Sequence, residues 1–147
     1  MKPKADEEGS VTEQDQRQAT NGAPKVLVVE DELLIRWSLR EALLDAGFEV
    51  LEAESASEAR ARFSEKPDAA ILDLRLPDAD GTALLRELVA DSTEGVVSLM
   101  ISAYATPEMV QAAKTAGAFD LVAKPFKVER IVEILEEAMA VAKNEAA

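Results

Sequence analysis

The chain has 147 residues, a length that suits one domain, and 48% of them are hydrophobic but only 4% are aromatic, so its core must be mainly aliphatic. A net charge of −13 repels nucleic-acid phosphates and argues against direct nucleic-acid binding. The absence of cysteine and histidine excludes disulfides, thiolate chemistry, histidine zinc sites and histidine general bases.

The first residues, 1–24, are polar and charged and end in the chain breakers Asn21-Gly22-Ala23-Pro24, so we predict a disordered tail. They lack the apolar core of a secretory signal, and no stretch approaches the roughly 20 apolar residues of a membrane span. We therefore expect a cytoplasmic protein without a membrane partner. Composition changes at Lys25, and we expect one domain over 25–143 and a short C-terminal tail over 144–147.

Five short segments are predicted to be strands: four are apolar runs, which are typical of strands that are covered on both faces, and the second has a weaker pattern. They span 26–29, 48–53, 68–73, 96–101 and 118–122. Helical patterns lie between and after them. Ile35, Leu39 and Leu43 recur at helical spacing, and Gly47 ends that helix. The polar residues of this segment fall on its other side: Arg36, Arg40, Glu41 and Asp45.

Capping signals mark two further helices. Ser55 and Glu58 have the capping-box spacing, which predicts a helix that runs to about residue 65. Thr106-Pro107 predicts an N-cap followed by proline at the first helical position, in a helix that ends at Gly117. Two more helices are expected over about 82–91 and from 128 to near 143.

This alternation predicts an α/β fold of the flavodoxin-like (βα)5 type, with a five-stranded, doubly wound parallel sheet. In such sheets ligands bind beyond the carboxyl ends of the strands. Polar residues follow four of the predicted strands at that edge: Glu30, Asp31, Asp73, Ser102 and Lys124. We therefore expect these side chains to converge.

Three neighbouring carboxylates need a positive charge to stay ionised, and Mg²⁺ prefers oxygen ligands. Asp73 is the best nucleophile, because an ionised carboxylate can attack phosphorus without a general base and give an acyl phosphate. Lys124 and Ser102 would neutralise phosphoryl oxygens. Taken singly, the same residues have plainer interpretations: a helix N-cap for Asp31, a turn carboxylate for Asp73, a loop hydroxyl for Ser102 and a solvated lysine for Lys124.

Over about 25–143 the sequence resembles the receiver domain of two-component response regulators. The resemblance rests on Val28-Val29-Glu30-Asp31-Glu32, Ile71-Leu72-Asp73-Leu74-Arg75-Leu76-Pro77-Asp78 with Gly81, Met100-Ile101-Ser102-Ala103-Tyr104, Gly117-Ala118-Phe119-Asp120 and Lys124-Pro125-Phe126. Ile35-Arg36-Trp37-Ser38-Leu39 and Ser102-Ala103-Tyr104 look most like receivers of regulators that activate alternative-sigma-factor promoters.

The resemblance implies that Asp73 accepts a phosphoryl group, in a magnesium-dependent reaction, from a phosphohistidine of a sensor histidine kinase or phosphotransfer protein. It implies magnesium ligation by Asp31, Asp73 and the backbone carbonyl of Arg75, with Glu30 acting through water.

Ser102 matches the switch hydroxyl of the family and Lys124 its phosphate-binding lysine, with a cis bond to Pro125. The family usually has an aromatic residue three positions before this lysine, where this chain has Leu121. Tyr104 or Phe119 would then take part in the switch, or the serine and backbone act alone.

Phosphorylation is expected to change the surface of about residues 103–143, where a homodimer or an output partner would bind. The chain is then not an enzyme beyond its own phosphorylation and dephosphorylation. Two alternatives stay open: a magnesium-dependent aspartyl-phosphate phosphatase, and a receiver-like interaction module that is never phosphorylated. Arg75 argues against the phosphatase, because such enzymes need an acid at that position.

Overall fold

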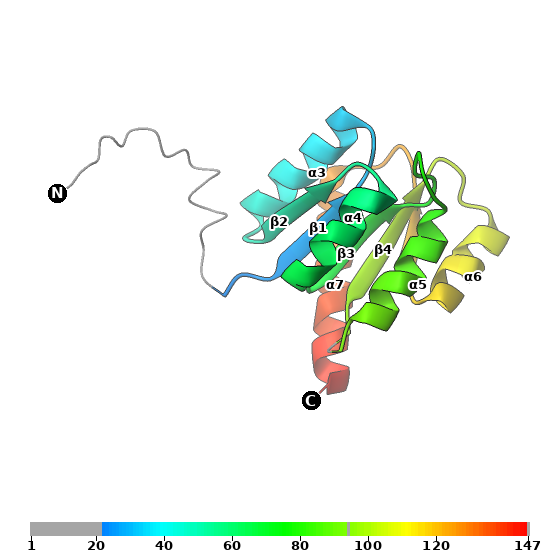
Figure 1. Ribbon diagram of the computed structural model, residues 1–147. Coiled ribbons are helices and arrows are strands. Elements are labelled where there is room, and N and C mark those ends of the chain that lie inside the picture. The colour runs from blue at the N-terminus through cyan, green and yellow to red at the C-terminus, as the bar shows by residue number, and fades with distance from the viewer. Residues whose placement is uncertain (1–21, 94, 147) are drawn as a thin grey trace.

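Five parallel strands form one sheet in the computed structural model of the protein, which describes residues 22–93 and 95–146 (Figure 1). They are β1 (Lys25–Val29), β2 (Glu49–Ala53), β3 (Ala69–Asp73), β4 (Val97–Ser102) and β5 (Asp120–Ala123). The order across the sheet is β2-β1-β3-β4-β5, and every neighbouring pair is parallel. The predicted doubly wound, flavodoxin-like sheet is confirmed.

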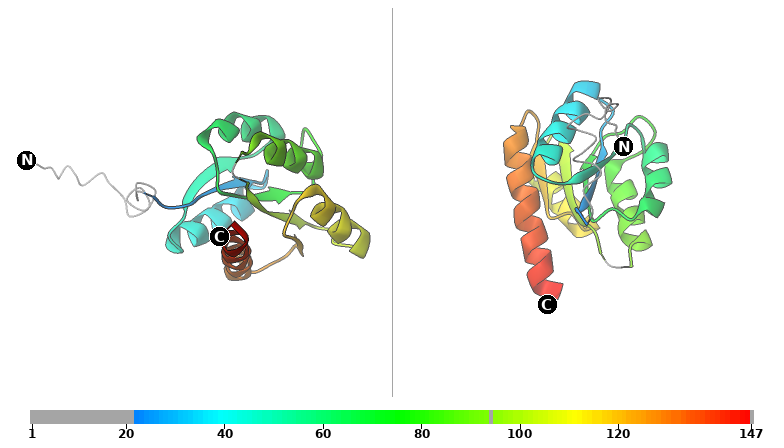
Figure 2. Two further views of the ribbon diagram at one scale, coloured as in Figure 1. Left: turned by 90° about the horizontal axis from the view of Figure 1, so that it is seen from below. Right: turned by 90° about the vertical axis from the view of Figure 1, so that its left-hand side faces the viewer.

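Helices cover both faces of this sheet, as Figure 2 shows from two directions. On one face lie α3 (Leu33–Asp45) and α7 (Val128–Ala146). The other face carries α4 (Ala56–Arg62), α5 (Gly81–Asp91) and α6 (Pro107–Ala116). A 3₁₀ turn, η1 (Phe63–Glu65), follows α4. The sheet therefore lies between two helical layers, as the nearly continuous apolar sequences of β1 and β3 require.

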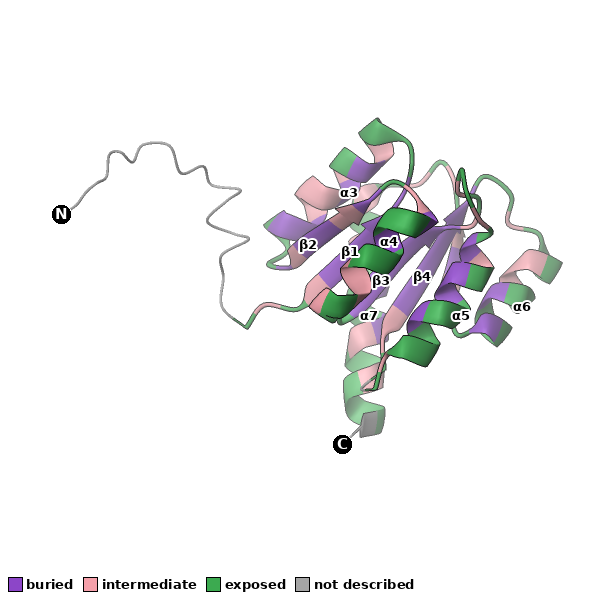
Figure 3. Cartoon of the chain, viewed as in Figure 1, coloured by how far each residue is buried: buried purple, intermediate pink, exposed green. Residues whose placement is uncertain are grey.

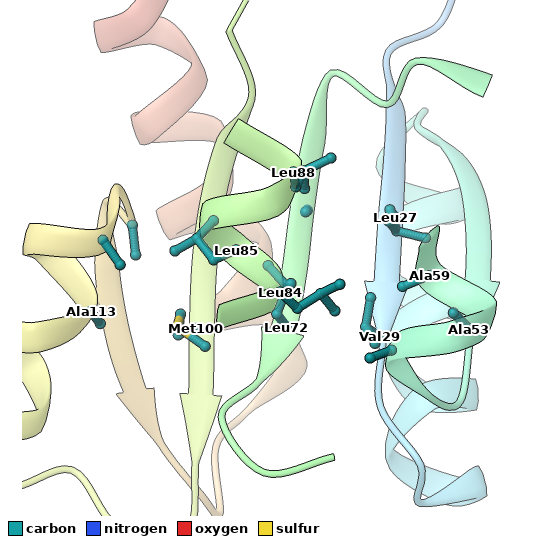
Figure 4. Packing of buried hydrophobic residues seen from close by; sticks show 14 of the residues in the cluster. Leu27, Val29, Ala53, Ala59, Leu72, Leu84, Leu85, Leu88, Met100 and Ala113 are labelled. Atoms are coloured by element: carbon teal, nitrogen blue, oxygen red, sulfur yellow. The ribbon is translucent and has the colours of Figure 1, made fainter. Parts of the chain in front are cut away.

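Alternate side chains of each strand enter two separate cores. On β1, Leu27 and Val29 pack under α4–α6, whereas Val26 and Val28 pack under α3 and α7. The strands are buried and the outer helix faces are exposed (Figure 3). In the first core, leucines of α5 lie against β3 and β4 (Figure 4). The aliphatic core predicted from the composition is present.

Capping residues define two of the helices as predicted. The Ser55 hydroxyl accepts a hydrogen bond from the Glu58 N–H at 3.1 Å, but the Glu58 carboxylate accepts from the Glu54 N–H and not from that of Ser55. The Thr106 hydroxyl accepts from the Met109 N–H, and Gly117 ends α6 with a φ of 118°.

Several predicted strand ends are off by one residue, and two boundaries differ by more. The last helix continues to Ala146, beyond the expected end near Lys143, because residues 144–146 contain no helix breaker. The last strand begins at Asp120 and not at residue 118. Of the tail predicted over residues 1–24, residues 1–21 lie outside the part of the chain that the structure describes. Among the residues that the structure describes, no helix has the length and apolar character needed to cross a membrane.

Candidate functional site

Parallel pairing brings the carboxyl ends of four strands to one edge of the sheet. Val29 pairs with Leu72, Asp73 with Ile101 and Ser102 with Ala123. The polar residues that end or follow these strands therefore share that edge, as predicted.

Lys124 is the centre of the site. Its Nζ donates a hydrogen bond to Asp73 Oδ2 at 2.8 Å and lies 2.7 Å from Glu30 Oε1. Glu32 Oε1 is 3.5 Å away and was not predicted to belong to the site. The Lys124 side chain is only 14% exposed, so this ammonium is no solvated surface charge. The bond from Lys124 to Pro125 is cis, as the resemblance implied.

Three carboxylates form an acidic cluster beside this ammonium. Oxygen atoms of Glu30, Asp31 and Asp73 lie within 4.8 Å of one another. Glu30 and Asp73 are buried, whereas Asp31 is exposed. A single hard cation can contact carboxylate oxygens so arranged, and all the donors are oxygens, as Mg²⁺ or Ca²⁺ requires. The cluster therefore fits the divalent cation that the sequence predicted.

The pKa values of Glu30 and Lys124 reflect the excess of negative charge in the cluster. Burial is the main effect on Glu30, and with the nearby charge of Asp73 it raises the pKa of Glu30 to about 7 against the opposing contacts of Lys124 and the Glu32 N–H. Burial alone would lower the pKa of the Lys124 ammonium. Its hydrogen bond to Asp73 and its ion pair with Glu30 outweigh burial and raise that pKa above the usual value of lysine. One ammonium thus faces two buried carboxylates.

The loop after β3 fixes the Asp73 carboxylate. Asp73 Oδ1 accepts a hydrogen bond from the Arg75 N–H at 3.0 Å, and the Leu74 N–H donates to the Ile101 carbonyl at 2.9 Å. A Cβ atom on Gly81 would overlap the Asp73 carbonyl oxygen, so the start of α5 approaches β3 as closely as only glycine allows.

The predicted switch residues occupy different surroundings. The buried Ser102 hydroxyl accepts a hydrogen bond from the Tyr104 N–H at 3.0 Å, which leaves its own O–H free to donate. The Tyr104 ring is exposed, and the Arg75 guanidinium lies 5.5 Å from its centre. Leu121 is buried in the core under α4–α6. Phe119 precedes β5, at the amino end of the sheet, so it lies at the edge opposite Ser102.

Arg36 is one prediction that was wrong. The helical pattern set it apart from the apolar stripe of α3, but it is 9% exposed. Its Nη1 donates to the Glu30 carbonyl at 2.8 Å and its Nε to Glu52 Oε1 at 3.1 Å. Buried arginine needs such partners, and they come from β2 and from the loop after β1, which helical spacing alone does not reveal. Arg36 therefore braces the segment that carries Glu30 and Asp31.

Comparison with known proteins decides the family. Residues 26–136 match the family "Response regulator receiver domain". The chain belongs to this family. The receiver is 37% identical over 116 residues to the chemotaxis protein CheY of Listeria monocytogenes, an alignment that covers 78% of this chain and 97% of that protein. It is also 37% identical over 116 residues to the transcriptional regulatory protein PhoP of Escherichia coli K12, with 78% of this chain and 52% of PhoP covered.

Solved structures agree. A CheY-like response regulator receiver domain from Methanospirillum hungatei superimposes with a TM-score of 0.78 at 27% identity, covering 84% of this receiver and 99% of that chain. A response regulator from Burkholderia pseudomallei, solved with a phosphorylated aspartic acid, a calcium ion and citrate, has a TM-score of 0.71 at 28% identity and covers 84% and 73%. These relatives support a receiver of two-component signalling, but not the narrower resemblance to alternative-sigma-factor activators.

Proposed function

We propose that Asp73 of this receiver accepts a phosphoryl group from a phosphohistidine. The observation that carries the assignment is the contact of one partly buried ammonium, that of Lys124, with Asp73 and Glu30 beside Asp31. Isolated turn carboxylates and solvated lysines, the plainer interpretations of these residues, do not produce such a cluster. The phosphorylated aspartic acid of the Burkholderia relative supports the same chemistry.

Magnesium fits the acidic cluster as the cofactor. Asp31 and Asp73 would hold it together with the backbone carbonyl of Arg75, and Glu30 would act through water. When bound, Mg²⁺ supplies positive charge for the carboxylates and for the oxygens of the incoming phosphoryl group.

The residues of the chain then divide the work of transfer. An Asp73 carboxylate oxygen forms the new bond to phosphorus while the phosphorus–nitrogen bond of the phosphohistidine breaks, and the imidazole nitrogen keeps that electron pair. The Lys124 ammonium, already 2.8 Å from Asp73, stays beside a phosphoryl oxygen. Ser102 donates its free O–H to another. No base is required, so the absence of histidine is no obstacle.

A donor protein has a place to dock next to Lys124. A largely apolar groove of about 530 Å³ lies between α3 and the segment after β5, lined by Leu34, Ile35, Pro125 and Phe126 among others. Leu33, Leu34 and Trp37 are exposed on the same helix. A sensor histidine kinase or a phosphotransfer protein of the cytoplasm is the partner that this surface would bind.

Phosphorylation would act as a switch. It adds roughly two negative charges and strong acceptors at Asp73, which draw the Ser102 hydroxyl toward them. The Tyr104 N–H then loses its partner, and the surface formed by about residues 103–143 changes so that it can bind a second copy of the chain or an output partner. Position 121 has a buried leucine in place of the family's aromatic residue. The proposed switch therefore uses Ser102 and Tyr104.

Intact-mass measurement tests this function. The protein is incubated with acetyl phosphate and Mg²⁺, and the parent is compared with Asp73→Asn and with Asp91→Asn, which removes an exposed carboxylate at the end of α5. We expect one added phosphoryl mass in the parent and in Asp91→Asn, and none in Asp73→Asn or with excess chelator. Equal labelling of Asp73→Asn and the parent would refute the assignment of Asp73.

A further inference from the structure

The loop between β3 and α5 is fastened to α4 by one side chain, Asp78. Its Oδ1 accepts a hydrogen bond from the Ala56 N–H at 2.8 Å, and its Oδ2 accepts from the Ser57 N–H at 3.0 Å. Both bonds favour the ionised carboxylate, and they lower the pKa of Asp78. One carboxylate thus binds the first two N–H groups of a helix that is distant in sequence.

The other hydrogen bonds of this loop are local or lie at its base. The Gly81 N–H donates to the Leu74 carbonyl at 2.7 Å, and the Leu76 N–H donates to the Ala79 carbonyl at 3.1 Å. These bonds close the loop on itself, and Leu76 and Ala79 pack against the core under α4–α6, but neither contact is a hydrogen bond from the loop to another element. Within the described residues, the two bonds of Asp78 are the only hydrogen bonds between this loop and α4.

We infer that Asp78 is a positioning residue that holds the loop, and with it the Arg75 carbonyl, in the place required for cation binding at the acidic cluster. The inference rests on the proposed function, in which that carbonyl is a magnesium ligand. Arg75 lies three residues before Asp78, inside the segment that Asp78 closes against α4. Metal–ligand distances vary by only a few tenths of an ångström, so a mobile loop holds its carbonyl at a binding distance for a smaller fraction of the time.

The size of the effect follows from population. If the loop without Asp78 spends only a fraction of its time in the competent position, the apparent dissociation constant for Mg²⁺ rises by the inverse of that fraction. Removing groups that orient metal ligands typically weakens binding 10–100-fold. Because the Arg75 N–H bond to Asp73 and the base of the loop remain, we expect about tenfold, the lower end of that range.

The chain offers a matched control on the same helix. Ser55 caps α4 through the Glu58 N–H but makes no hydrogen bond to the loop, so Ser55→Ala weakens the helix and leaves the loop attached. Asp78→Ala removes the bonds to the first two N–H groups and detaches the loop. Asp78→Asn keeps one acceptor oxygen, and its effect should lie between those of Asp78→Ala and the parent.

Three measurements on the whole chain test the inference: Mg²⁺ affinity by isothermal titration calorimetry, the urea midpoint in chelator, and hydrogen exchange of the Ala56 and Ser57 amides in metal-free protein. In Asp78→Ala we expect about tenfold weaker Mg²⁺ binding and faster exchange of both amides. Asp78→Ala and Ser55→Ala should lower the urea midpoint by similar amounts, but Ser55→Ala should keep the Mg²⁺ affinity of the parent.

Three results would overturn the inference: unchanged Mg²⁺ affinity in Asp78→Ala, an equal loss of affinity in Ser55→Ala, or unchanged exchange of the two amides in Asp78→Ala. The proposed function is judged separately, because it fails only if the parent does not become phosphorylated at Asp73.

Discussion

Lys124→Met removes the positive charge from the site and keeps an unbranched side chain of similar length. Lys124 Nζ lies 2.7 Å from Glu30 Oε1 and 2.8 Å from Asp73 Oδ2, and no other ammonium or guanidinium within the described residues pairs with either carboxylate. Without it, two buried carboxylates face each other without a counter-charge. We therefore expect a large loss of stability in metal-free protein.

The magnitude follows from the burial of the pair. Removing one partner of a buried ion pair costs roughly 3–5 kcal/mol. The Lys124 side chain is 14% exposed, so we expect about 3 kcal/mol at pH 8, where Glu30, with a pKa of about 7, is ionised in the folded parent. Mg²⁺ should reduce this deficit, because the variant cluster carries one more net negative charge and binds the cation more tightly.

Urea unfolding, followed by circular dichroism with and without Mg²⁺, measures both effects. Lys127→Met is the control, because this lysine is exposed and its substitution should change the free energy of unfolding by about 0.5 kcal/mol or less. A deficit in Lys124→Met that is equally large in Mg²⁺ and in chelator would refute the view that the ammonium and the cation neutralise the same carboxylates.

Three further predictions concern the supports of the site. Arg36→Met should cost about 2 kcal/mol in urea unfolding, since the Glu30 carbonyl loses a buried donor; a change under 0.5 kcal/mol would contradict this. In chelator, the folded pKa of Glu30, about 7, exceeds its ordinary 4.5, so its contribution to stability is present below pH 4.5 and lost as pH rises through 7. Relative to Glu30→Gln, the parent should lose on the order of 2–3 kcal/mol across that window, and parallel pH profiles would oppose the assignment. Gly81→Ala should cost about 3 kcal/mol and reduce phosphoryl labelling, because its Cβ overlaps the Asp73 carbonyl oxygen; parent-like stability and labelling would show that the loop can move aside.

The relation between the two halves of the site gives these predictions a common basis. Glu30 and Asp31 follow β1 and are braced by Arg36, whereas Asp73 ends β3 and Arg75 lies in the next loop, which Asp78 fastens. The charge of Lys124 joins the halves. Substitution of Arg36 or Asp78 should therefore affect the acidic cluster although it removes none of the three carboxylates.

Much of this receiver could be predicted from its sequence. Continuous apolar runs separated by helical spacings give parallel strands between two helical layers, since only that arrangement buries both faces of such strands. Parallel strands end at one edge, so the residues that follow them had to meet. That reasoning correctly brought together Glu30, Asp31, Asp73 and Lys124, and local capping signals such as that of Thr106 correctly placed a helix start.

Tertiary contacts determine the burial and the partners of several polar residues, which local sequence patterns do not predict. Helical spacing put Arg36 on a polar face, but β2 and the loop after β1 bring it carboxylate and carbonyl partners that make burial favourable. Glu32 reaches Lys124, and Asp78 reaches α4, only because the crossover connections bring these segments side by side. Spacing along a chain fixes which face or edge a residue occupies. The burial and the partners of a residue depend on which distant segment packs against it, and only the tertiary structure determines that segment.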